Sequence, residues 1–494
     1  MTRFRNDTKI LIIGAGIGGL TTAAVLSKAG LDVSVLESQV YPGGCASTFF
    51  HKGYRFDAGA TLAAGFYPGG PMDLLGEAAG ISDWPIQYDS PAMVVHLPNG
   101  QQIPCHNEES RWEEYRNVFG ESSQGFFRWQ EETADLLWRF ALRLPSWPVK
   151  SVNDAISVIR SVDSRIILAS PRLAREVFRS VSKHLQNMPE NLRMFVDGQL
   201  LISAQTTGEY ANALYSASAL DLPRRGVVHL EKGIGTLAEI LVSAIKSNGG
   251  RVIFRQEVTK VTHNKQCRLI VQTKKNEEFE AEVVIGNLTP WNLAELMQYN
   301  LPKTLKKLPA FPEKNWGAFM LYLGVDNNVI PEGLPLHHQV IQKLPLGEGN
   351  SFFISISPEW DKSRAPDEQR ALTISTHTRP GNWWKLFESD KHKYQEQKEL
   401  MTEKVLGAVE QVLPGVKSAV RLLLPGTPIT FKRYTGRVHG WVGGFPQTSL
   451  FETFHPKITD NLWLVGDSIF PGQSTAAVAL GGLRVAKDIL TGLS

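Results

Sequence analysis

Short apolar runs that end at a glycine recur along the chain, and the clearest lies near the N-terminus. Residues 9–13 read Lys-Ile-Leu-Ile-Ile, which predicts a strand buried on both faces of a parallel sheet. After a glycine-rich turn, residues 20–29 fit a helix that Gly30 ends, and residues 32–37 fit a second strand closing on Glu37. This pattern predicts a βαβ unit.

The turn of this unit has the glycine spacing of a dinucleotide-binding site. The glycines of the turn are Gly14, Gly16, Gly18 and Gly19. Gly14 permits a tight turn, Gly16 lets the backbone approach a pyrophosphate, and Gly19 allows close packing of helix on strand. The helix N-terminus faces the phosphates with unpaired N–H groups, and Glu37 accepts hydrogen bonds from the adenosine ribose. We therefore predict a Rossmann-like nucleotide domain.

A second glycine pair distinguishes an FAD-binding domain from a nicotinamide-binding one. Gly43 and Gly44 follow Glu37 closely, so their N–H groups can make a second approach to the diphosphate. Many FAD oxidoreductases have this arrangement, whereas nicotinamide-binding domains usually lack it. The predicted cofactor is FAD.

The end of the chain returns to the same site. Residues 462–465 predict a short buried strand, Gly466 and Asp467 follow it, and residues 475–490 predict a helix. Asp467 is placed to bind the ribityl chain of FAD. The helix N-terminus can face the flavin pyrimidine and stabilise negative charge there.

The middle of the chain supplies further elements of the nucleotide domain. Residues 237–248 predict a helix, 249–254 a strand, 257–261 a candidate edge strand, and 282–287 another buried strand. Val258 is the residue expected to contact adenine through its backbone. Ordinary sheet structure explains each of these residues almost as well.

The remaining segments predict two further units, and a chain of 494 residues has room for about three domains. Residues 91–96 and 101–105 predict a hairpin around Asn99-Gly100, and 316–323 and 351–356 predict strands that roof the flavin. Residues 110–214 predict mostly helix. We expect a discontinuous FAD domain (1–85, 215–299, 431–494), a substrate sheet domain (86–109, 300–430) and a helical subdomain (110–214).

Composition excludes several classes of function. The net charge is only +3, which gives no support for nucleic-acid binding. Cys45, Cys105 and Cys267 form no CxxC pair, so no metal site is predicted and a reducing compartment is the simpler reading. No signal peptide and no run of 18 apolar residues is visible. No Ser-His-Asp set stands out either, which fits chemistry carried by a cofactor.

Three strings carry a family resemblance, at residues 53–60, 229–237 and 465–473. With them the chain resembles the carotenoid desaturase and isomerase branch of the FAD amine-oxidase-like superfamily, and is most similar to carotenoid C-3′,4′ desaturases. The resemblance implies an amine-oxidase-like α/β fold and a hydrophobic C40 carotenoid substrate. It also implies hydride loss from an allylic carbon to flavin N5, and a quinone or other electron acceptor. One departure is Cys45, where some relatives carry a basic residue, so a positive charge near the diphosphate is expected to be missing.

Three other functions compete with desaturation. The first is cis–trans isomerisation of a carotenoid such as prolycopene with no net redox change. The second is a non-catalytic prenyl carrier of the Rab-escort type, which would have no use for the FAD contacts of Glu37 and Asp467. The third is a soluble amine oxidase, which usually attaches or cages its flavin with a late cysteine or an aromatic pair, and no cysteine follows Cys267.

The catalytic side chains and the membrane contact are predicted from single loop residues and from a basic helical segment. Glu209, Arg437 and His439 are the candidates near the flavin. Between Arg139 and Lys183 the chain has nine basic and three acidic residues among apolar ones. Such a surface is typical of peripheral attachment to anionic lipid, here on the cytoplasmic side of a membrane. A solvated face over an internal core is the alternative.

Overall fold

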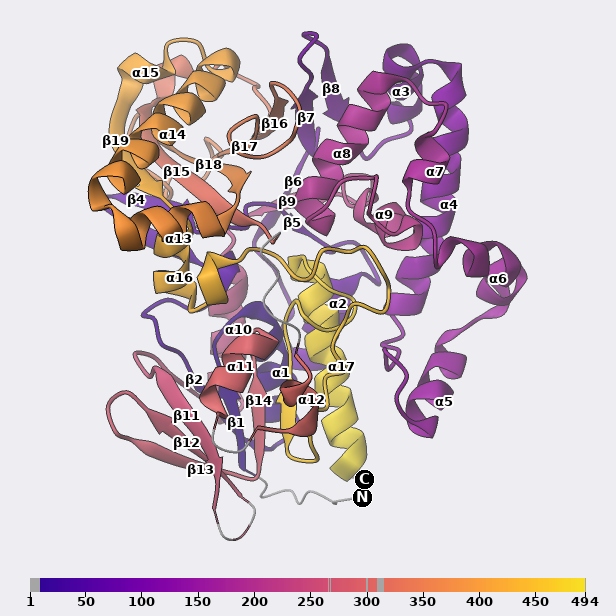
Figure 1. Cartoon of the computed structure of the whole chain (residues 1–494), viewed down its shortest axis with the longest axis vertical. Helices are drawn as coiled ribbons and strands as arrows, with labels where there is room; N and C mark the ends of the chain where they lie inside the picture. Colours follow the sequence, from indigo (N-terminus) through magenta and orange to yellow (C-terminus); the bar gives the residue numbers. More distant parts are fainter. Residues whose placement is uncertain (1–8, 265, 267, 299–300, 309–314, 494) are drawn as a thin grey trace.

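The computed structural model describes residues 9–264, 266, 268–298, 301–308 and 315–493. A five-stranded parallel sheet lies in the lower half of Figure 1, in the order β10-β2-β1-β14-β20. Its strands are β1 (Lys9–Ile13), β2 (Asp32–Leu36), β10 (Arg251–Ile253), β14 (Val283–Gly286) and β20 (Leu462–Leu464). Five of the six strands predicted for the nucleotide domain therefore lie in this sheet.

Helices pack around this sheet, which explains why its strands are apolar on both faces. They are α1 (Ile17–Lys28), α2 (Pro71–Ala79), α10 (Thr236–Ser247) and α17 (Thr475–Leu493). The α1 helix contacts the other three. Gly30, just after α1, lies in the left-handed region with a φ of 84°, a conformation that glycine adopts without strain.

Residues 257–261 belong to a different sheet. They form most of β11 (Val258–His263), which pairs with β12 (Leu269–Thr273) and β13 (Glu278–Ala281) in an antiparallel sheet of order β11-β12-β13. The predicted edge strand is thus an edge strand, but of this separate sheet. Arg255, with a φ of 59°, turns the chain away from β10 just before it.

A seven-stranded sheet of order β19-β15-β18-β17-β16-β7-β8 lies above the nucleotide sheet in Figure 1. Its strands are β7 (Met93–His96), β8 (Gln102–Cys105), β15 (Gly317–Asp326), β16 (His337–Ile341), β17 (Ser351–Ile356), β18 (Gln369–Thr378) and β19 (Val420–Gly426). Neighbouring strands are antiparallel except β16 and β7. The predicted β7–β8 hairpin is confirmed, with Gly100 at a φ of 84° in its turn.

Side chains that alternate along these strands divide the sheet into a helix-covered face and an opposite face. On β15, Phe319, Leu321 and Leu323 pack with Val405 and Val409 of a helix. The covering helices are α13 (Pro380–Ser389), α14 (Lys391–Val412) and α15 (Val416–Ala419). On the opposite face of β15, Ala318 and Met320 line the cavity described below.

Residues 110–214 are mainly helical, as predicted, and lie along the right side of Figure 1, with α5 lowest. The helices are α3 (Arg111–Phe119), α4 (Gln124–Ala141), α5 (Val152–Ser161), α6 (Ser164–Glu176), α7 (Ser182–Leu185), α8 (Glu190–Ala204) and α9 (Ala213–Ala219). Phe127 and Phe195 share a core with Val95 and Ile341 of the seven-stranded sheet. The α5 and α6 helices stand at the outer edge of this block.

Short elements connect these parts. Two small sheets contain β3 (Thr48–His51) with β4 (Tyr54–Asp57), and β5 (Ala63–Ala64) with β9 (Val227–Leu230) and β6 (Ile86–Asp89). The remaining helices are α11 (Pro290–Leu296), α12 (Lys303–Lys306) and α16 (Pro428–Thr435), with 3-10 turns at Gly44–Ala46, Glu121–Ser123, Asn327–Val329 and Val438–Gly440. None of the described helices is both long and apolar enough to cross a bilayer.

Candidate active site

A cavity of about 900 Å³ runs from the β1–α1 turn to the seven-stranded sheet and the helical block. One end is lined by the glycine turns and by Glu37, and the other by residues of β15 to β18, α4, α8 and α9. Segments far apart in the sequence therefore line one cavity. Such a cavity between layers is the usual place for a cofactor and its substrate.

The glycine turn at the nucleotide end is shaped by backbone contacts. Gly14 has a φ of 95°. A Cβ on Gly19 would lie 2.7 Å from the Gly14 carbonyl oxygen, and one on Gly16 would lie 2.3 Å from Asn287 Nδ2. Gly14, Gly16 and Gly18 line the cavity, whereas Gly19 lies behind it in the contact between helix and strand. This is the division of tasks that the spacing predicts.

The N-terminus of α1 is open toward the cavity. Its N-cap residue is Gly16, which has no side chain to accept a hydrogen bond from the first turn. The exposed N–H groups and the positive end of the helix dipole therefore suit a diphosphate.

Glu37 is held in a fixed position at this end. Its side chain is only 7% exposed. Oε2 accepts a hydrogen bond of 2.7 Å from the Ala15 N–H, and Oε1 accepts one of 2.8 Å from the Gln39 N–H. The carboxylate thus reaches the cavity already oriented for a ribose hydroxyl.

The second glycine pair lies directly against the first. The Gly43 N–H donates a hydrogen bond of 2.7 Å to the Ala15 carbonyl, and Gly16 and Gly43 form a parallel bridge. Both Gly43 and Gly44 have positive φ, at 107° and 58°, and both line the cavity. The two glycine turns form one cradle. Val258 also lines the cavity, together with Gln256 and Thr259.

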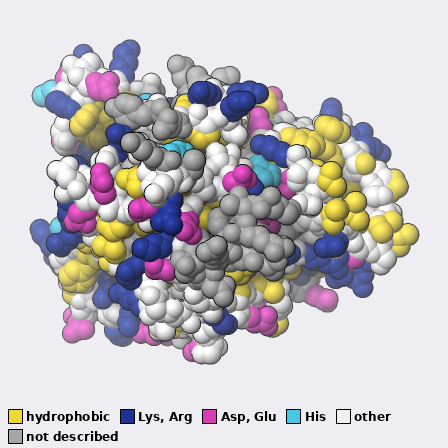
Figure 2. Space-filling view, turned by 90° about the horizontal axis from the view of Figure 1, so that it is seen from below, with side chains coloured by type: hydrophobic (Ala, Val, Ile, Leu, Met, Phe, Trp, Pro, Cys, Tyr) yellow, Lys and Arg dark blue, Asp and Glu magenta, His cyan; other side chains and the backbone are white. Residues whose placement is uncertain are grey.

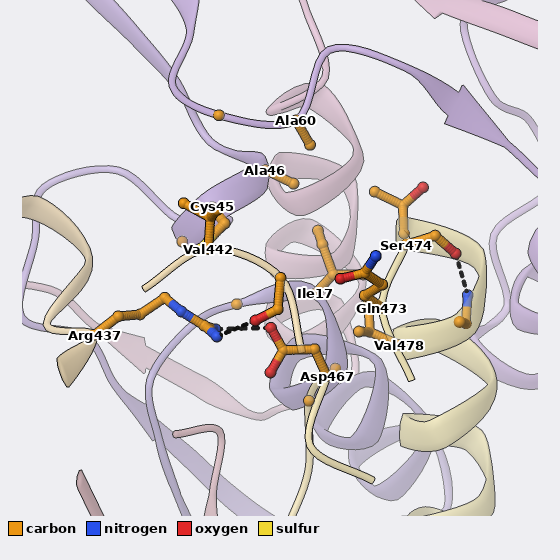
Figure 3. A pocket seen from close by; sticks show the side chains of 18 of the residues that line it. Ile17, Cys45, Ala46, Ala60, Arg437, Val442, Asp467, Gln473, Ser474 and Val478 are labelled. Atoms are coloured by element: carbon orange, nitrogen blue, oxygen red, sulfur yellow. Dashed lines mark hydrogen bonds and ion pairs between the residues drawn. The ribbon is translucent and has the colours of Figure 1, made fainter. Parts of the chain in front are cut away.

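The C-terminal segment closes the cradle from the other side, as Figure 3 shows. Gly466 has a φ of 117°, and a Cβ on Gly18 would lie 3.1 Å from its backbone nitrogen. Asp467 lines the cavity and forms an ion pair of 2.8 Å with Arg437. Gln473, before the N-terminus of α17, accepts a hydrogen bond of 3.0 Å from the Gly444 N–H.

Arg437 changes the electrostatics expected at Cys45. Its guanidinium interacts with both Cys45 and Asp467, and its Nε donates a hydrogen bond of 2.8 Å to the Trp441 carbonyl. A cation therefore does lie beside Cys45, contrary to the expectation from the sequence, because residues 436–444 fold back over the glycine pair. Burial raises the pKa of the Cys45 thiol, and the nearby Arg437 partly opposes this.

The residues of the cradle fit a dinucleotide. The glycines of both turns leave room for a diphosphate to approach the backbone, whose N–H groups can bind it. Glu37 supplies an acceptor for a ribose hydroxyl. Among the described residues, no group of His, Cys, Asp and Glu could hold a metal ion.

Comparison with known proteins gives consistent matches over the whole chain. The profile of the NAD(P)-binding Rossmann-like domain matches residues 12–73. Prolycopene isomerase 1 of an Oncidium hybrid cultivar is 29% identical over 97% of this chain and 84% of its own length. The 4,4′-diapolycopen-4-al dehydrogenase of Metabacillus indicus is 24% identical over 98% and 97%. The neurosporene-forming phytoene desaturase of Cereibacter sphaeroides is 23% identical over 95% and 92%.

The chain resembles carotenoid desaturases and isomerases over nearly its whole length. It is an FAD-dependent enzyme, and the residues of the cradle described above fit FAD. The enzymes of this family to which it is similar include both redox enzymes and isomerases, so the family by itself does not fix the reaction.

Solved structures show the same fold at lower identity. An oxidoreductase from Methanosarcina mazei aligns with a TM-score of 0.65 and 18% identity, covering 97% of this chain and all of its own. Putrescine oxidase bound to putrescine aligns with a TM-score of 0.63 and 15% identity, covering 98% and 99%. The amine-oxidase-like α/β fold is therefore confirmed, and the likeness at these identities concerns the fold alone.

The structure places the three catalytic candidates differently. Arg437 lines the cavity, but its guanidinium is engaged by Asp467 and backbone carbonyls. Glu209 is exposed and lies outside the cavity wall, where it interacts with Tyr210 and Asp197. His439 is also exposed and off the wall, and it contacts the Trp384 ring. The expectation that all three lie near the flavin is therefore not supported, because loop sequence does not fix the direction of a side chain.

Sequence analysis missed the polar side chains that the seven-stranded sheet presents to the cavity. Gln339, Ser375 and His377 all lie on the wall. Burial and, to a smaller extent, the neighbouring Arg379 cation lower the pKa of His377 to about 4. The alternation of residues 373–378 was the available signal, since it places Ser375 and His377 on one face of β18.

Proposed function

We propose that this enzyme desaturates a C40 carotenoid with FAD, introducing the C-3′,4′ double bond into an acyclic or monocyclic end group. The observation that carries the proposal is the continuity of the FAD cradle with an apolar cavity. Beyond the cradle the wall is built largely from apolar side chains such as Leu201, Met320 and Phe352. A hydrocarbon chain is the substrate class that such a wall accommodates.

The tasks of the chain's own residues follow from their positions. When bound, FAD supplies a two-electron acceptor for a hydride. Glu37 would hold the adenosine ribose and Asp467 the ribityl chain, while the N-termini of α1 and α17 would face anionic parts of the cofactor. Phe352 and Met320 keep water from the reacting carbons.

The position of the new double bond rests on the resemblance of the strings at 59–65 and 473–483 to C-3′,4′ desaturases. A second candidate is cis–trans isomerisation, which the 29% identity to prolycopene isomerases over 97% of the chain favours. The two reactions differ in their products. Desaturation removes two hydrogens and lengthens the chromophore, whereas isomerisation leaves the mass unchanged.

The test is to supply FAD-loaded enzyme with an all-trans acyclic or monocyclic carotene and an electron acceptor such as a quinone. We expect a product lighter by two hydrogens, with absorption at longer wavelength and acceptor consumed in proportion. A product of unchanged mass, formed from a cis carotene under reducing conditions, would establish the isomerase instead.

We further propose that α5 and α6 bind the surface of a membrane that holds the substrate. Val152, Ile156 and Ile159 form one face of α5 and are 77%, 40% and 70% exposed. Leu168 and Phe178 are 83% and 82% exposed. Figure 2 shows hydrophobic side chains gathered on the lobe at its right, with basic side chains along the border. Such a face suits the boundary between headgroups and acyl chains.

The basic residues of this region have different partners. Arg172 pairs with Glu132 at 2.9 Å, and Arg175 and Arg179 lie 3.5 and 3.7 Å from Glu176. These three arginines support the helices internally. Lys150, Arg160 and Arg165 are exposed beside the apolar face, so they are the better candidates for contact with anionic lipid.

An aromatic row links the proposed membrane face to the cavity. Trp147 lines the cavity, and its ring lies 5.5 Å from that of Phe451. The Phe451 ring in turn lies 6.1 Å from that of the exposed Phe178. This row provides an apolar path along which a carotenoid can leave the bilayer.

A further inference from the structure

A row of polar side chains leads from the cavity wall into the seven-stranded sheet. Thr61 lines the cavity, and its Oγ1 accepts a hydrogen bond of 2.7 Å from Ser355 Oγ. Ser355 Oγ lies 3.0 Å from Nδ1 of His337, and Nε2 of His337 lies 3.3 Å from Oδ2 of Asp89. The contacts are set by the sheet, since His337 and Ser355 are direct partners on β16 and β17.

The row is shielded from water along most of its length. Ser355 and His337 are 7% and 2% exposed, and the Asp89 side chain is 8% exposed. Asp89 ends β6 and is followed by the exposed Ser90. The row therefore joins an apolar cavity to a carboxylate near the surface. Sequence analysis found no Ser-His-Asp set because these three residues come from three separate strands.

The proposed desaturation requires a proton acceptor, and this row of polar side chains can provide one. Two hydrogens leave neighbouring carbons, one as a hydride and the other as a proton, and the proton needs an acceptor inside an apolar cavity. Among the described residues, the imidazole on the wall itself is that of His377, which lies beside the Arg379 cation and is poorly suited to take up a second positive charge. His337 instead faces a carboxylate, which would stabilise an imidazolium.

Resting on the proposed function, we propose that Thr61, Ser355 and His337 form a proton relay for the substrate. The two hydroxyls first rotate, so that Thr61 Oγ1 donates its hydrogen bond to Ser355 Oγ and Ser355 Oγ donates to His337 Nδ1. Thr61 Oγ1 then takes the proton from the carbon as its own hydroxyl proton moves to Ser355 Oγ, and the Ser355 proton moves to His337 Nδ1. The electron pair of the broken C–H bond becomes the new π bond, and the neighbouring hydride is taken by FAD. Asp89 is a positioning residue that stabilises the charged imidazole.

The experiment compares Thr61→Val, which keeps the shape but removes the hydroxyl, with Thr61→Ser, which keeps the hydroxyl. FAD-loaded enzyme is mixed anaerobically with carotene in detergent micelles, and loss of the oxidised-flavin absorbance is followed in H₂O and D₂O. We expect Thr61→Val to slow this step about 100-fold, the scale of general acid–base catalysis, and Thr61→Ser to stay close to wild type. Thr402→Val, a buried threonine on α14 far from the cavity, controls for the loss of a hydroxyl as such.

The solvent isotope effect separates a relay from a structural role. Wild type should be slower in D₂O, because the hydroxyl protons of Thr61 and Ser355 exchange, and Thr61→Val should lose this effect. Ser355→Ala should behave like Thr61→Val. The relay is refuted if Thr61→Val reacts as fast as wild type, or keeps its isotope effect, or if only His377→Gln is slow. A wild-type enzyme that leaves the flavin oxidised under these conditions refutes the proposed desaturation itself.

Discussion

Arg437 and Asp467 form an ion pair of 2.8 Å on the wall of the FAD cradle, and the same guanidinium interacts with Cys45. The two side chains of the pair are 14% and 16% exposed. The cation that the sequence seemed to lack beside the second glycine pair thus comes from a distant segment. It both orients Asp467 and places positive charge close to the cofactor.

Arg437→Met should weaken FAD binding and lower stability. It removes the cation and leaves the largely buried Asp467 unpaired, and breaking a buried pair costs about 3–5 kcal/mol. Titration of apoprotein with FAD, followed by flavin fluorescence, measures the affinity. Arg433→Met is the control, since Arg433 is an exposed residue of α16, shortly before Arg437. Equal affinities of Arg437→Met and wild type would show that the pair does not support the cofactor.

Glu37→Ala should release FAD more readily, because a ribose hydroxyl loses a fixed anionic acceptor. Hydrogen bonds to a charged group contribute about 1.5–3 kcal/mol, which corresponds to roughly 10- to 150-fold in affinity. The same titration measures this change, with Glu239→Ala on the exposed side of α10 as the control. An unchanged affinity would mean that Glu37 only supports the turn through Ala15 and Gln39.

FAD should be held without a covalent bond. Cys45 lines the cradle, but burial raises the pKa of its thiol, so the nucleophilic thiolate is disfavoured. Acid precipitation of the purified holoenzyme should leave all yellow colour in the supernatant. Flavin that stays on the pellet in wild type but not in Cys45→Ser would identify Cys45 as an attachment site.

Val152→Asp combined with Ile159→Asp should abolish binding to anionic liposomes. Both side chains are largely exposed on one face of α5, and a carboxylate there opposes insertion by charge and by desolvation. Sedimentation with vesicles measures binding, and Leu400→Asp, which changes a side chain 65% exposed on α14, is the control. Turnover of carotene in detergent should persist in the double variant.

The basic residues give a second test of the same surface. Charge reversal of Lys150, Arg160 and Arg165 should reduce vesicle binding with a steep dependence on salt. Charge reversal of Arg172, Arg175 and Arg179 should also lower stability, since it breaks their contacts with Glu132 and Glu176. If neither set of substitutions changes vesicle binding, any membrane contact lies elsewhere on the protein.

Stability should fall as the pH drops below about 6.5, partly through His338. Burial and the neighbouring His96 imidazole lower the pKa of His338 from 6.5 to about 4. Between these values the unfolded chain binds a proton that the folded protein does not, so folding is less favourable in acid. The loss between pH 7 and pH 5 is about 2 kcal/mol at most for this group.

Urea unfolding at both pH values measures this loss. His338→Gln should flatten the pH dependence, whereas His392→Gln, which changes an exposed residue of α14, should not. If the free energy of unfolding of His338→Gln depends on pH as steeply as that of wild type, other groups account for the pH dependence.

The sequence by itself determined the nucleotide half of this protein. The βαβ unit, both glycine pairs, Glu37 and Asp467 were all predicted, because the conformations they need depend on local chemistry. Positive φ requires glycine, and a strand buried on both faces requires an unbroken apolar run. The 373–378 alternation shows the limit, since it indicates two faces of β18 but not which one lines a cavity.

Only the tertiary structure decided which distant side chains meet. Arg437 reaches Cys45 because the 436–444 segment folds back over the cradle, and His337 meets Ser355 through the register of two strands. Sequence spacing carries no record of such pairings, since strand register and loop direction are set by packing of the whole sheet. For the same reason the sequence showed basic and apolar residues together between Arg139 and Lys183, but only the fold shows that the apolar face of α5 points outward.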